Sequence, residues 1–393
     1  MQIGIVGKPN TGKSTFFKAA TLVDAEIGNR PFVTIKANQG TGYVTQKCVH
    51  REKGIDCQPM NSKCEKGTRM VPIQMLDVAG LVPDAWQGKG LGNQFMNDLM
   101  QANALVHVLD ASGSTDAEGN EVAKGSYEIS QDVEFLEKEV AYWILGILKR
   151  NWDKLSKSLS MSGNIADGIA NQLSGLGVKE EEVKAVMRND IFKKKPSEWS
   201  EETLLEFSSS IREKSKPMII AANKCDVDGS AERIDKLKSA FPKYEIIPSS
   251  AESELALRKA DQTGVVSYVP GSKEFEIVKE LPGAQKKALD FIQEKVLDVY
   301  GSTGVQTAIN KTAFDLLGLV AVYPVQDPNK WMSGKGHVLP DTFLVKKGTN
   351  PKELAGIIHT DFAKDIWVQL TAEAERKFLK VMTFRIMMSL RFC

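Results

Sequence analysis

The sequence has little of what marks a membrane-spanning, secreted or strongly nucleic-acid-binding protein. Its 393 residues include five cysteines and carry a formal net charge of +1, which is too few thiols for a disulfide framework and too little charge for a global basic field. The longest apolar runs, such as 141–148 and 316–323, are far shorter than the ~20 residues of a membrane span. The N-terminus lacks the charged and apolar regions of a secretory signal. We therefore expect a cytoplasmic protein with reduced thiols and no membrane partner. The oligomeric state stays open, with a monomer favoured.

What the sequence does contain is most informative near its start. Residues 2–6 (QIGIV) predict a buried strand, residues 7–14 read GKPNTGKS, and residues 15–22 (TFFKAATL) predict a helix. This order of strand, glycine-rich loop and helix matches the G-x-x-x-x-G-K-[ST] motif of a P-loop. The backbone N–H groups of such a loop converge on phosphate oxygens at a helix N-terminus, where the helix dipole favours negative charge. The loop therefore predicts a site for a nucleoside phosphate.

The side chains of this loop have separate expected tasks. Lys13 is expected to reach the β- and γ-phosphates and to assist catalysis, and the Ser14 hydroxyl is expected to ligate Mg²⁺. The residues of the loop that are expected to contact the nucleotide are Gly7, Asn10, Thr11, Gly12, Lys13, Ser14 and Thr15.

A second magnesium ligand is expected where the next buried strand ends. Residues 72–76 (PIQML) predict that strand, and Asp77 and Gly80 follow it as the two fixed positions of a D-x-x-G sequence. An aspartate there can hold Mg²⁺ through water, and the Gly80 N–H can sense the γ-phosphate. The D-x-x-G pattern alone is weak, and its distance from the P-loop is what favours the functional interpretation.

A switch threonine is expected between the first helix and the D-x-x-G sequence. Thr34, in the segment PFVTI, can close over Mg²⁺ and the γ-phosphate, and we count it with Lys13 and Gly80 as catalytic. Thr21 and Thr41 are rivals, but Thr21 belongs to the predicted helix and Thr41 to the start of the next strand.

The next motif selects the base. Residues 217–222 (PMIIAA) predict a buried strand, which is followed by Asn223, Lys224 and Asp226. The Asp226 carboxylate can accept hydrogen bonds from the N1–H and the exocyclic amine of guanine, a pair of donors that adenine lacks. Asn223 can tie this segment to the P-loop, and the stem of Lys224 can lie along the base.

A short segment, 249–251 (SSA), completes the set. The backbone at Ser250 and Ala251 can donate to the guanine carbonyl, although this motif has almost no weight in isolation. Four motifs in this order predict an α/β fold of the P-loop NTPase class, namely a G domain with a doubly wound, mostly parallel sheet. Its expected ligands are GTP and Mg²⁺.

These motifs also resemble a known family. GKPNTGKS, PFVTI, DVAGLV, the glycine-rich GKGLGNQF at 88–95 and NKCD, in this order, resemble the Obg-related GTPases and, within them, the archaeal branch of the YchF subfamily. The resemblance covers nearly the whole chain, and residues 338–344 (VLPDTFL) are similar to the start of a TGS domain, a small β-grasp module. It implies that the protein associates with the ribosome or ribosomal RNA and acts in translation or the stress response.

The resemblance also bears on the reaction. Some members lack an intact N-K-x-D and prefer ATP, so Asn223, Lys224 and Asp226 argue for GTP here. Leu81 stands where Ras-like proteins have a catalytic glutamine, which implies slow intrinsic hydrolysis. Asn10 matches the P-loop asparagine that places K⁺ in some related GTPases. Two alternatives stay open: an ATPase of the same family, and a ribosome-docking scaffold that nucleotide stabilises with negligible hydrolysis.

The domain organisation follows from length and composition. We expect a G domain of the OBG type over residues 1–317, with a helical insertion at about 134–216, and a TGS-like β-grasp domain over 318–393. The insertion is rich in Glu, Lys, Leu and Ser and is expected to form a helical hairpin that is available for a partner. Its lysine run at 193–195 is interpreted as a solvated stretch, with a ribosomal RNA contact as the alternative.

A possible metal site lies outside these motifs. Three cysteines and one histidine are close together in the sequence, and both residue types suit zinc. The paired C-x-x-C spacing is missing, so we favour unrelated thiols and keep a zinc site as the alternative. The four residues are Cys48, His50, Cys57 and Cys64.

The end of the chain departs from the family pattern. A TGS domain should finish with an alternating strand of the form D-V-I-x-I, which residues 373–393 do not contain. Permitted codons for these residues, read two nucleotides later, can spell an ending with D-V-I-K-I. We therefore hypothesise a frameshift near 364–367, in the gene or its sequencing, that makes the residues after about 364 aberrant. Third codon bases that do not allow this reading would contradict the hypothesis.

Overall fold

The computed structural model describes residues 1–22, 39–78, 80, 86, 92–162, 164–327, 329–358 and 381–383. The chain divides into two compact units. The first consists of Met1–Gly42 and Gln74–Thr312, and the second of Tyr43–Ile73 and Ala313–Cys393. None of the helices formed by these described residues is both long and apolar enough to span a bilayer.

The larger sheet, whose strands β1, β5, β6 and β7 belong to the first unit, is mostly parallel and has the strand order β2-β4-β1-β5-β6-β7, with β3 paired to β4. β1 is parallel to β4 and β5, β5 is parallel to β6, and β6 is parallel to β7. Every residue of β5 and β6 is buried, as expected for central parallel strands covered on both faces. The strands are β1 Gln2–Val6, β2 Gln39–Lys47, β3 Lys63–Glu65, β4 Thr68–Asp77, β5 Ala104–Asp110, β6 Met218–Asn223 and β7 Ile246–Pro248.

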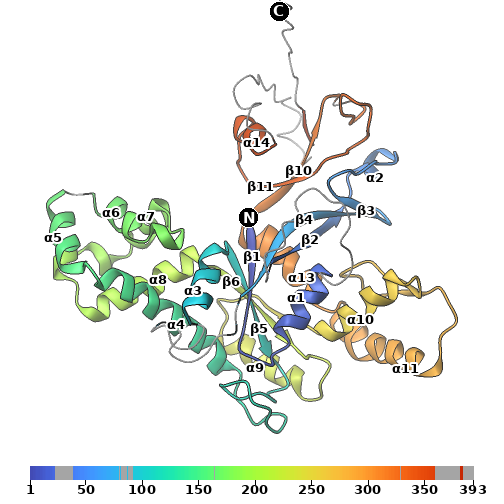
Figure 1. Cartoon of the computed structure of the whole chain (residues 1–393), viewed down its shortest axis with the longest axis horizontal. Coiled ribbons are helices and arrows are strands. Elements are labelled where there is room, and N and C mark those ends of the chain that lie inside the picture. Colours follow the sequence, from blue (N-terminus) through green and yellow to red (C-terminus); the bar gives the residue numbers. More distant parts are fainter. Residues whose placement is uncertain are drawn as a thin grey trace, which may run out of the picture. The chain divides into compact units, whose positions relative to one another are not determined.

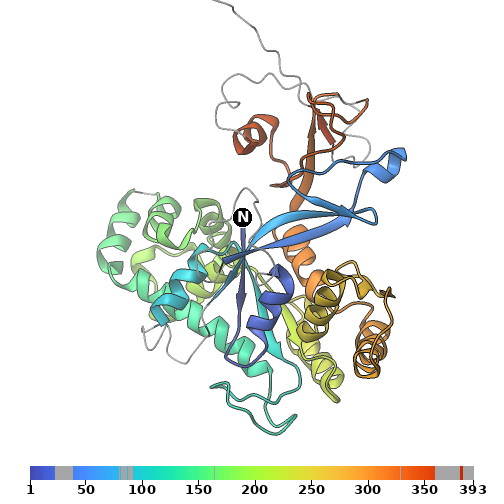
Figure 2. The same cartoon turned by 45° about the vertical axis from the view of Figure 1, so that its right-hand side comes forward.

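Helices cover both faces of this sheet. Figure 1 shows α1, α10 and α13 on one face and α3 and α4 on the other, and Figure 2 shows the same arrangement from another side. Apolar residues of the central strands pack with Phe95 and Leu99 of α3 in one continuous core. This architecture confirms the predicted α/β fold with a doubly wound, mostly parallel sheet. The helices named here are α1 Lys13–Thr21, α3 Gly92–Gln101, α4 Ser130–Lys149, α10 Ala251–Gln262 and α13 Val305–Lys311.

The segment between β5 and β6 contains the helical insertion. The helices α4 and α8 pack against each other, as a hairpin would, but several shorter helices lie between them in the sequence, so a simple hairpin is not formed. Aromatic rings pack at the end of this insertion. The ring of Trp199 is stacked on that of Trp152, with 5.5 Å between their centroids, and is tilted against that of Phe207, with 5.0 Å between their centroids. The helices after α4 are α5 Trp152–Ser162, α6 Ile165–Gln172, η2 Ser174–Leu176, α7 Glu180–Val186, η3 Asp190–Lys193, η4 Pro196–Glu198 and α8 Glu201–Ser215.

The remainder of the first unit follows β6. The helix α13 packs against α1, which brings the end of this unit next to its start. The elements are α9 Ser230–Ala240, the antiparallel pair β8 Val266–Ser267 and β9 Glu276–Ile277, α11 Gly283–Ile292, the π-helix η5 Gln293–Leu297 and α12 Asp298–Tyr300.

The second unit contains a three-stranded sheet in the order β11-β10-β12. β10 is antiparallel to β11 and parallel to β12, and Leu354 and Ala355 of α14 pack on Val322 and Val345. Its elements are α2 His50–Lys53, the π-helix η6 Thr312–Leu316, which starts at the end of the first unit, β10 Leu319–Val325, β11 Phe343–Lys346, α14 Pro351–Ile358 and β12 Val381–Thr383.

The division into units differs from the predicted domains at residues 43–73, and the boundary before the C-terminal part follows Thr312 instead of residue 317. The sequence prediction assigns 43–73 to the G domain, whereas the structure groups this segment with the C-terminal residues. The reason is a set of backbone hydrogen bonds, including Gln58 N–H to the Val338 carbonyl at 2.8 Å and Met60 N–H to the Pro340 carbonyl at 2.7 Å. The TGS identity of the C-terminal part stays a prediction. Apart from β12, the residues of the hypothesised frameshift lie outside the described residues.

Candidate nucleotide-binding site

The P-loop starts at the carboxyl end of β1 and runs into α1, and two of its positions require glycine. A Cβ on Gly7 would lie 2.6 Å from the Val108 carbonyl oxygen, and one on Gly12 would lie 2.2 Å from Nδ2 of Asn223. Gly12 also has a φ of +88°, in the left-handed region that favours glycine, and its carbonyl accepts the N–H of Phe16 at 2.8 Å to begin α1. The loop therefore has the tight turn and close backbone approach that a phosphate cradle needs.

Three of the predicted phosphate and magnesium ligands, Lys13, Ser14 and Asp77, lie at or next to this loop. The register of β1 with β4 places Ile5 opposite Asp77, and the Asp77 carboxylate forms an ion pair with the Lys13 ammonium. Their side chains are 19% and 12% exposed, so a ligand can reach both. Ser14 is exposed in the first turn of α1. An ammonium group suits phosphate oxygens, and hydroxyl and carboxylate oxygens are the hard ligands that Mg²⁺ prefers.

Of the predicted switch residues, only Gly80 belongs to the described part of the chain. A Cβ on Gly80 would lie 3.5 Å from Cγ of Pro9, so this residue lies against the P-loop. Thr34 and Leu81 lie outside the described residues. Their expected roles therefore stay predictions.

Asn223, the last residue of β6, connects the base-recognition segments to the P-loop. Its Nδ2 donates to the Thr11 carbonyl at 2.9 Å, and its Oδ1 accepts the N–H of Ala251, also at 2.9 Å. The side chain is buried, with Asn223 only 3% exposed. The N–H of Cys225 donates to the Ser249 carbonyl at 3.0 Å, which is a second link between the segments 223–226 and 249–251. Segments more than 200 positions apart in sequence thereby form one site.

We predict that Asn223→Ala loosens this whole arrangement. The substitution leaves the Thr11 carbonyl and the Ala251 N–H without their partner in a buried environment, which costs about 1–3 kcal/mol of unfolding free energy. Urea unfolding measures that loss, and a fluorescent GTP analogue should bind at least about tenfold more weakly. Asn171→Ala, an exposed asparagine in α6, is the control and should change unfolding by less than about 0.5 kcal/mol. Equal values for the two variants would contradict the bridging role.

The side chain of Lys224 is held by the carboxylate of Asp110, which is not among the predicted site residues. Lys224 adopts a left-handed φ of +61°, and its ammonium contacts Asp110 Oδ2 at 2.8 Å. Burial acts to raise the pKa of Asp110, but hydrogen bonds from Lys224 and Ser112 outweigh it, so this pKa lies below its usual value. Asp110 ends β5, next to β6, and the polar S-x-S-T sequence after it was the available signal. Asp110 thus positions the lysine stem.

Asp226 has the exposure that base recognition requires. Asp226 is partly exposed, and its carboxylate accepts no hydrogen bond from any residue that the structure describes. The backbone before it is fixed, because the Tyr300 hydroxyl donates to the Cys225 carbonyl at 3.2 Å. A rigidly presented carboxylate with both oxygens available suits the paired donors of guanine.

The segment 249–251 differs in detail from its prediction. Its three N–H groups already donate to protein oxygens: Ser249 to Ala222 at 2.8 Å, Ser250 to Thr303 at 2.9 Å, and Ala251 to Asn223 at 2.9 Å. A guanine contact from Ser250 or Ala251 must therefore share or replace one of these bonds. The segment's observed task is to brace Asn223 and the start of α10.

The buried carboxyl group of Glu254 lies next to the segment 249–251 and contacts the residues that hold it. Glu254 is 1% exposed and receives hydrogen bonds from the Tyr268 hydroxyl at 2.8 Å and from the Thr303 hydroxyl. Burial raises the pKa of Glu254. Gly304 is required beside it, because its φ is +80° and a Cβ would lie 2.0 Å from the Pro248 carbonyl oxygen. Gly304 belongs to the sequence GSTGVQ at 301–306, which is not among the predicted site residues.

Contacts of Lys8 with residues 115–132 stabilise the first half of the P-loop. Lys8 is 4% exposed, forms an ion pair with Asp132 at 2.9 Å and lies 3.7 Å from the centroid of the Tyr127 ring. Burial lowers the pKa of Lys8. Breaking such a buried pair by removing one partner costs about 3–5 kcal/mol. Lys8 therefore fixes the loop and is not available to a ligand.

The remaining P-loop residues that are predicted to contact the nucleotide differ in their exposure to solvent. Asn10 is exposed, has a φ of +63°, and donates from Nδ2 to the Gly119 carbonyl at 2.9 Å. Thr11 is fully buried, and its hydroxyl donates to the Lys8 carbonyl at 3.1 Å. Thr15 is partly exposed in the first turn of α1. The potassium role of Asn10 stays a prediction.

Two family models match the chain. A model described as 50S ribosome-binding GTPase matches residues 2–140, which include the P-loop and Asp77. A model described as Obg-like GTPase YGR210-like, G4 motif-containing domain, matches residues 221–327, which include Asn223 and Asp226.

Full-length relatives agree with these matches. An uncharacterized GTP-binding protein of Methanocaldococcus jannaschii is 47% identical over 364 residues, covering 92% of this chain and 91% of the relative. The ribosome-binding ATPase YchF of Bacillus subtilis is 28% identical over 92% of this chain and 85% of its own length. The crystal structure of a GTP-binding protein from Pyrococcus horikoshii matches with a TM-score of 0.76 and 39% identity, covering 98% of this chain and 99% of that one.

Proposed function

Because this chain belongs to the Obg-like family of GTPases, which includes the YchF proteins, we propose that it binds and hydrolyses GTP as a molecular switch of the translation machinery. The observation that carries the proposal is the position of Asn223. Its two hydrogen bonds join the P-loop, the Asp226 segment and the start of α10 into one site for phosphate and base.

Guanine is favoured over adenine by the available carboxylate of Asp226. The M. jannaschii relative is named GTP-binding, whereas the B. subtilis relative is named an ATPase, so family membership alone does not choose the base. Asp226 can accept two hydrogen bonds from guanine but would face the N1 lone pair of adenine, which repels it. We therefore propose GTP, with ATP as the second candidate.

The residues at the phosphate end have distinct proposed roles. Lys13 exchanges its bond to Asp77 for the β- and γ-phosphates, and Ser14, Thr34 and Asp77 would hold Mg²⁺. When bound, Mg²⁺ neutralises negative charge on the phosphate oxygens. Gly80 lies against the P-loop and can report whether the γ-phosphate is present. With Leu81 after it, the chain offers no glutamine there to orient water, which supports slow intrinsic hydrolysis.

The ribosome is the proposed partner. The family model that matches the N-terminal part is described as ribosome-binding, and so is the B. subtilis relative. We also propose that the protein acts in the cytoplasm, where ribosomes are found, that the G domain extends to about 317, and that a TGS-like domain follows. Asn10 is the proposed residue for potassium-dependent stimulation.

Phosphate release with and without purified ribosomes tests this function. We expect slow release from GTP alone and an increase of about tenfold or more with ribosomes, with a higher rate in potassium than in sodium. Faster release from ATP than from GTP would instead support the ATPase candidate. A rate unchanged by ribosomes, together with ribosome binding that depends on nucleotide, would support the non-hydrolysing scaffold.

A further inference from the structure

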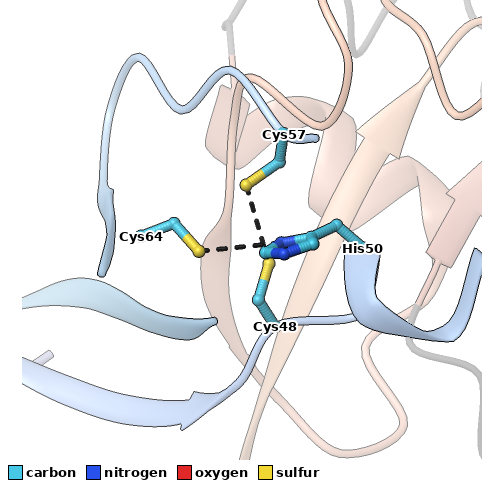
Figure 3. Close-up of side chains that lie close together, drawn as sticks. All are labelled: Cys48, His50, Cys57 and Cys64. Atoms are coloured by element: carbon cyan, nitrogen blue, oxygen red, sulfur yellow. Dashed lines mark hydrogen bonds between the residues drawn. The ribbon is translucent and has the colours of Figure 1, made fainter. Parts of the chain in front are cut away.

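Four potential metal ligands of the second unit converge although they are spread over 17 residues of sequence. Cys48 follows β2, His50 begins α2, Cys57 lies in the loop after α2, and Cys64 lies in β3. Their ligand atoms all lie within 4.8 Å of one another. Figure 3 shows the three sulfur atoms and the imidazole ring directed towards a common centre. We infer that Cys48, His50, Cys57 and Cys64 bind one Zn²⁺ ion in a closed, structural site.

The interatomic distances fit tetrahedral zinc. With Zn–S bonds of about 2.3 Å and Zn–N bonds of about 2.0–2.1 Å, two sulfurs lie about 3.8 Å apart and a sulfur and nitrogen about 3.6 Å apart. The structure has 3.9 Å between the sulfurs of Cys48 and Cys57, and 3.7 Å between Cys64 Sγ and His50 Nδ1. A disulfide needs about 2.05 Å between sulfurs. The four groups are thus arranged as ligands and not as a covalent pair.

The local backbone explains why the ligands meet. β3 and β4 form a hairpin whose two turn residues, Lys66 and Gly67, both have positive φ values, 47° and 78°. The Cys48 N–H donates to the Gly67 carbonyl at 2.8 Å, so the chain before α2 is fastened to this hairpin. Cys48 is fully buried, and the other three ligands are partly exposed. The hairpin presents Cys64 and the start of α2 presents His50.

A buried arginine provides an independent reason for an anionic centre here. Arg69 lies opposite Cys64 in the antiparallel β3–β4 pair and is 0% exposed. Its guanidinium donates to neutral oxygens, namely the Thr342 hydroxyl at 2.9 Å and the Leu339 carbonyl at 2.6 Å. Its Nη1 has no hydrogen-bond acceptor among the described residues. The Asp341 carboxylate is close enough to interact with it electrostatically, but the two form no hydrogen-bonded ion pair within the described part of the chain.

The charge of the proposed centre complements that arginine. Three thiolates, one neutral imidazole and Zn²⁺ sum to a charge of −1. A buried cation that forms no direct ion pair is costly, and an anion on the neighbouring strand lowers that cost. The same segment has little core of its own, since Val49, Ile55 and Cys57 share one small apolar cluster with Tyr323, Val325, Trp331 and the Val338–Leu339 pair. Zinc would therefore fix a segment that the hydrophobic effect stabilises only weakly.

Metal analysis of the full-length chain tests the inference. Protein purified under reducing conditions from zinc-supplemented cells should contain about one zinc per chain by mass spectrometry. Cobalt added to chelator-treated protein should give the visible absorption of tetrahedral Co²⁺ and thiolate charge-transfer bands. Both signals should fall at least tenfold in Cys57→Ser and Cys64→Ser. The matched controls are Cys225→Ser and His337→Ala, which should keep one metal ion per chain.

The outcomes separate the inference from its rivals and from the proposed function. Folding of the variants is checked by circular dichroism, and the wild-type cobalt spectrum remains decisive if a variant fails to fold. Wild-type protein that holds less than about a tenth of an equivalent of zinc and takes up no cobalt would overturn the inference, as would an iron cluster or a Cys48–Cys57 disulfide. Because no assay here contains nucleotide, a failed zinc site leaves the GTPase proposal standing, and the reverse also holds.

Discussion

Lys13→Ala is expected to abolish measurable GTP hydrolysis and to weaken GTP binding by at least about a hundredfold. The ammonium of Lys13 is the cation that the structure places at the P-loop beside Asp77. Its removal takes away the charge that we propose faces the β- and γ-phosphates, and it leaves the Asp77 carboxylate without its ion-pair partner beside the proposed phosphate site. Repulsion between that carboxylate and the phosphates therefore adds to the lost attraction. Titration with a fluorescent GTP analogue and single-turnover phosphate release measure the two effects.

Lys18→Ala is the matched control for this experiment. Lys18 is an exposed lysine in the same helix α1, so its removal makes the same chemical change away from the loop. Its variant should keep nucleotide affinity and turnover within about twofold of the wild type, since most exposed substitutions cost less than about 0.5 kcal/mol. A Lys13→Ala protein that hydrolyses GTP at the wild-type rate would contradict the P-loop assignment.

The local parts of this site could be predicted because each motif contains its own structural context. The run 2–6 is apolar and β-branched, and the loop that follows it has glycines where a Cβ would collide with Val108 or Asn223. Residues 217–222 are a continuous apolar run that coincides closely with β6, as expected for a central parallel strand. In an α/β sheet such strands bring their carboxyl ends to one edge, which places the motifs together.

Contacts that join distant segments without a motif could not be predicted in the same way. Nothing in the composition of 43–73 indicates that Gln58 and Met60 bond to the backbone of 338–340, about 280 positions away. The short β3 strand has no hydrophobic pattern that fixes its register. The missing C-x-x-C spacing likewise argued against zinc, whereas the convergence of the ligands depends on the turn at Lys66 and Gly67.

The base-recognition loop shows the same limit on a smaller scale. The sequence predicts that the backbone of Ser250 and Ala251 faces the guanine carbonyl, but both N–H groups are engaged by Thr303 and Asn223. Thr303 lies in the segment 301–306, for which the sequence predicts no contact with residues 249–251. Because these backbone donors are already bonded, we expect the choice of base to depend mainly on the side chain of Asp226.

Asp226→Asn should therefore collapse the preference for GTP over ATP. A hydrogen bond to a charged group contributes about 1.5–3 kcal/mol, so loss of the bond from the exocyclic amine weakens GTP binding by at least about 10–10²-fold. The amide oxygen of the new side chain can still accept the N1–H of guanine, but its amide nitrogen would face the exocyclic amine, which is also a donor. Xanthine carries a carbonyl in place of the exocyclic amine, so the variant should bind xanthosine triphosphate more tightly than GTP. Competition of the three triphosphates against one fluorescent analogue measures this change.

The control must make the same chemical change nearby without touching the base. Asp228→Asn serves, because the Asp228 side chain is 98% exposed and its recorded ion pair is a loose one of 3.8 Å to Lys295. Its affinities for all three nucleotides should stay within about twofold of the wild type. If Asp226→Asn instead leaves GTP affinity and the GTP-to-ATP ratio unchanged, then this carboxylate does not contact the base. The base would then have to be selected by the backbone of 249–251 after exchange of its present hydrogen bonds. That result would favour the ATPase candidate over the GTPase.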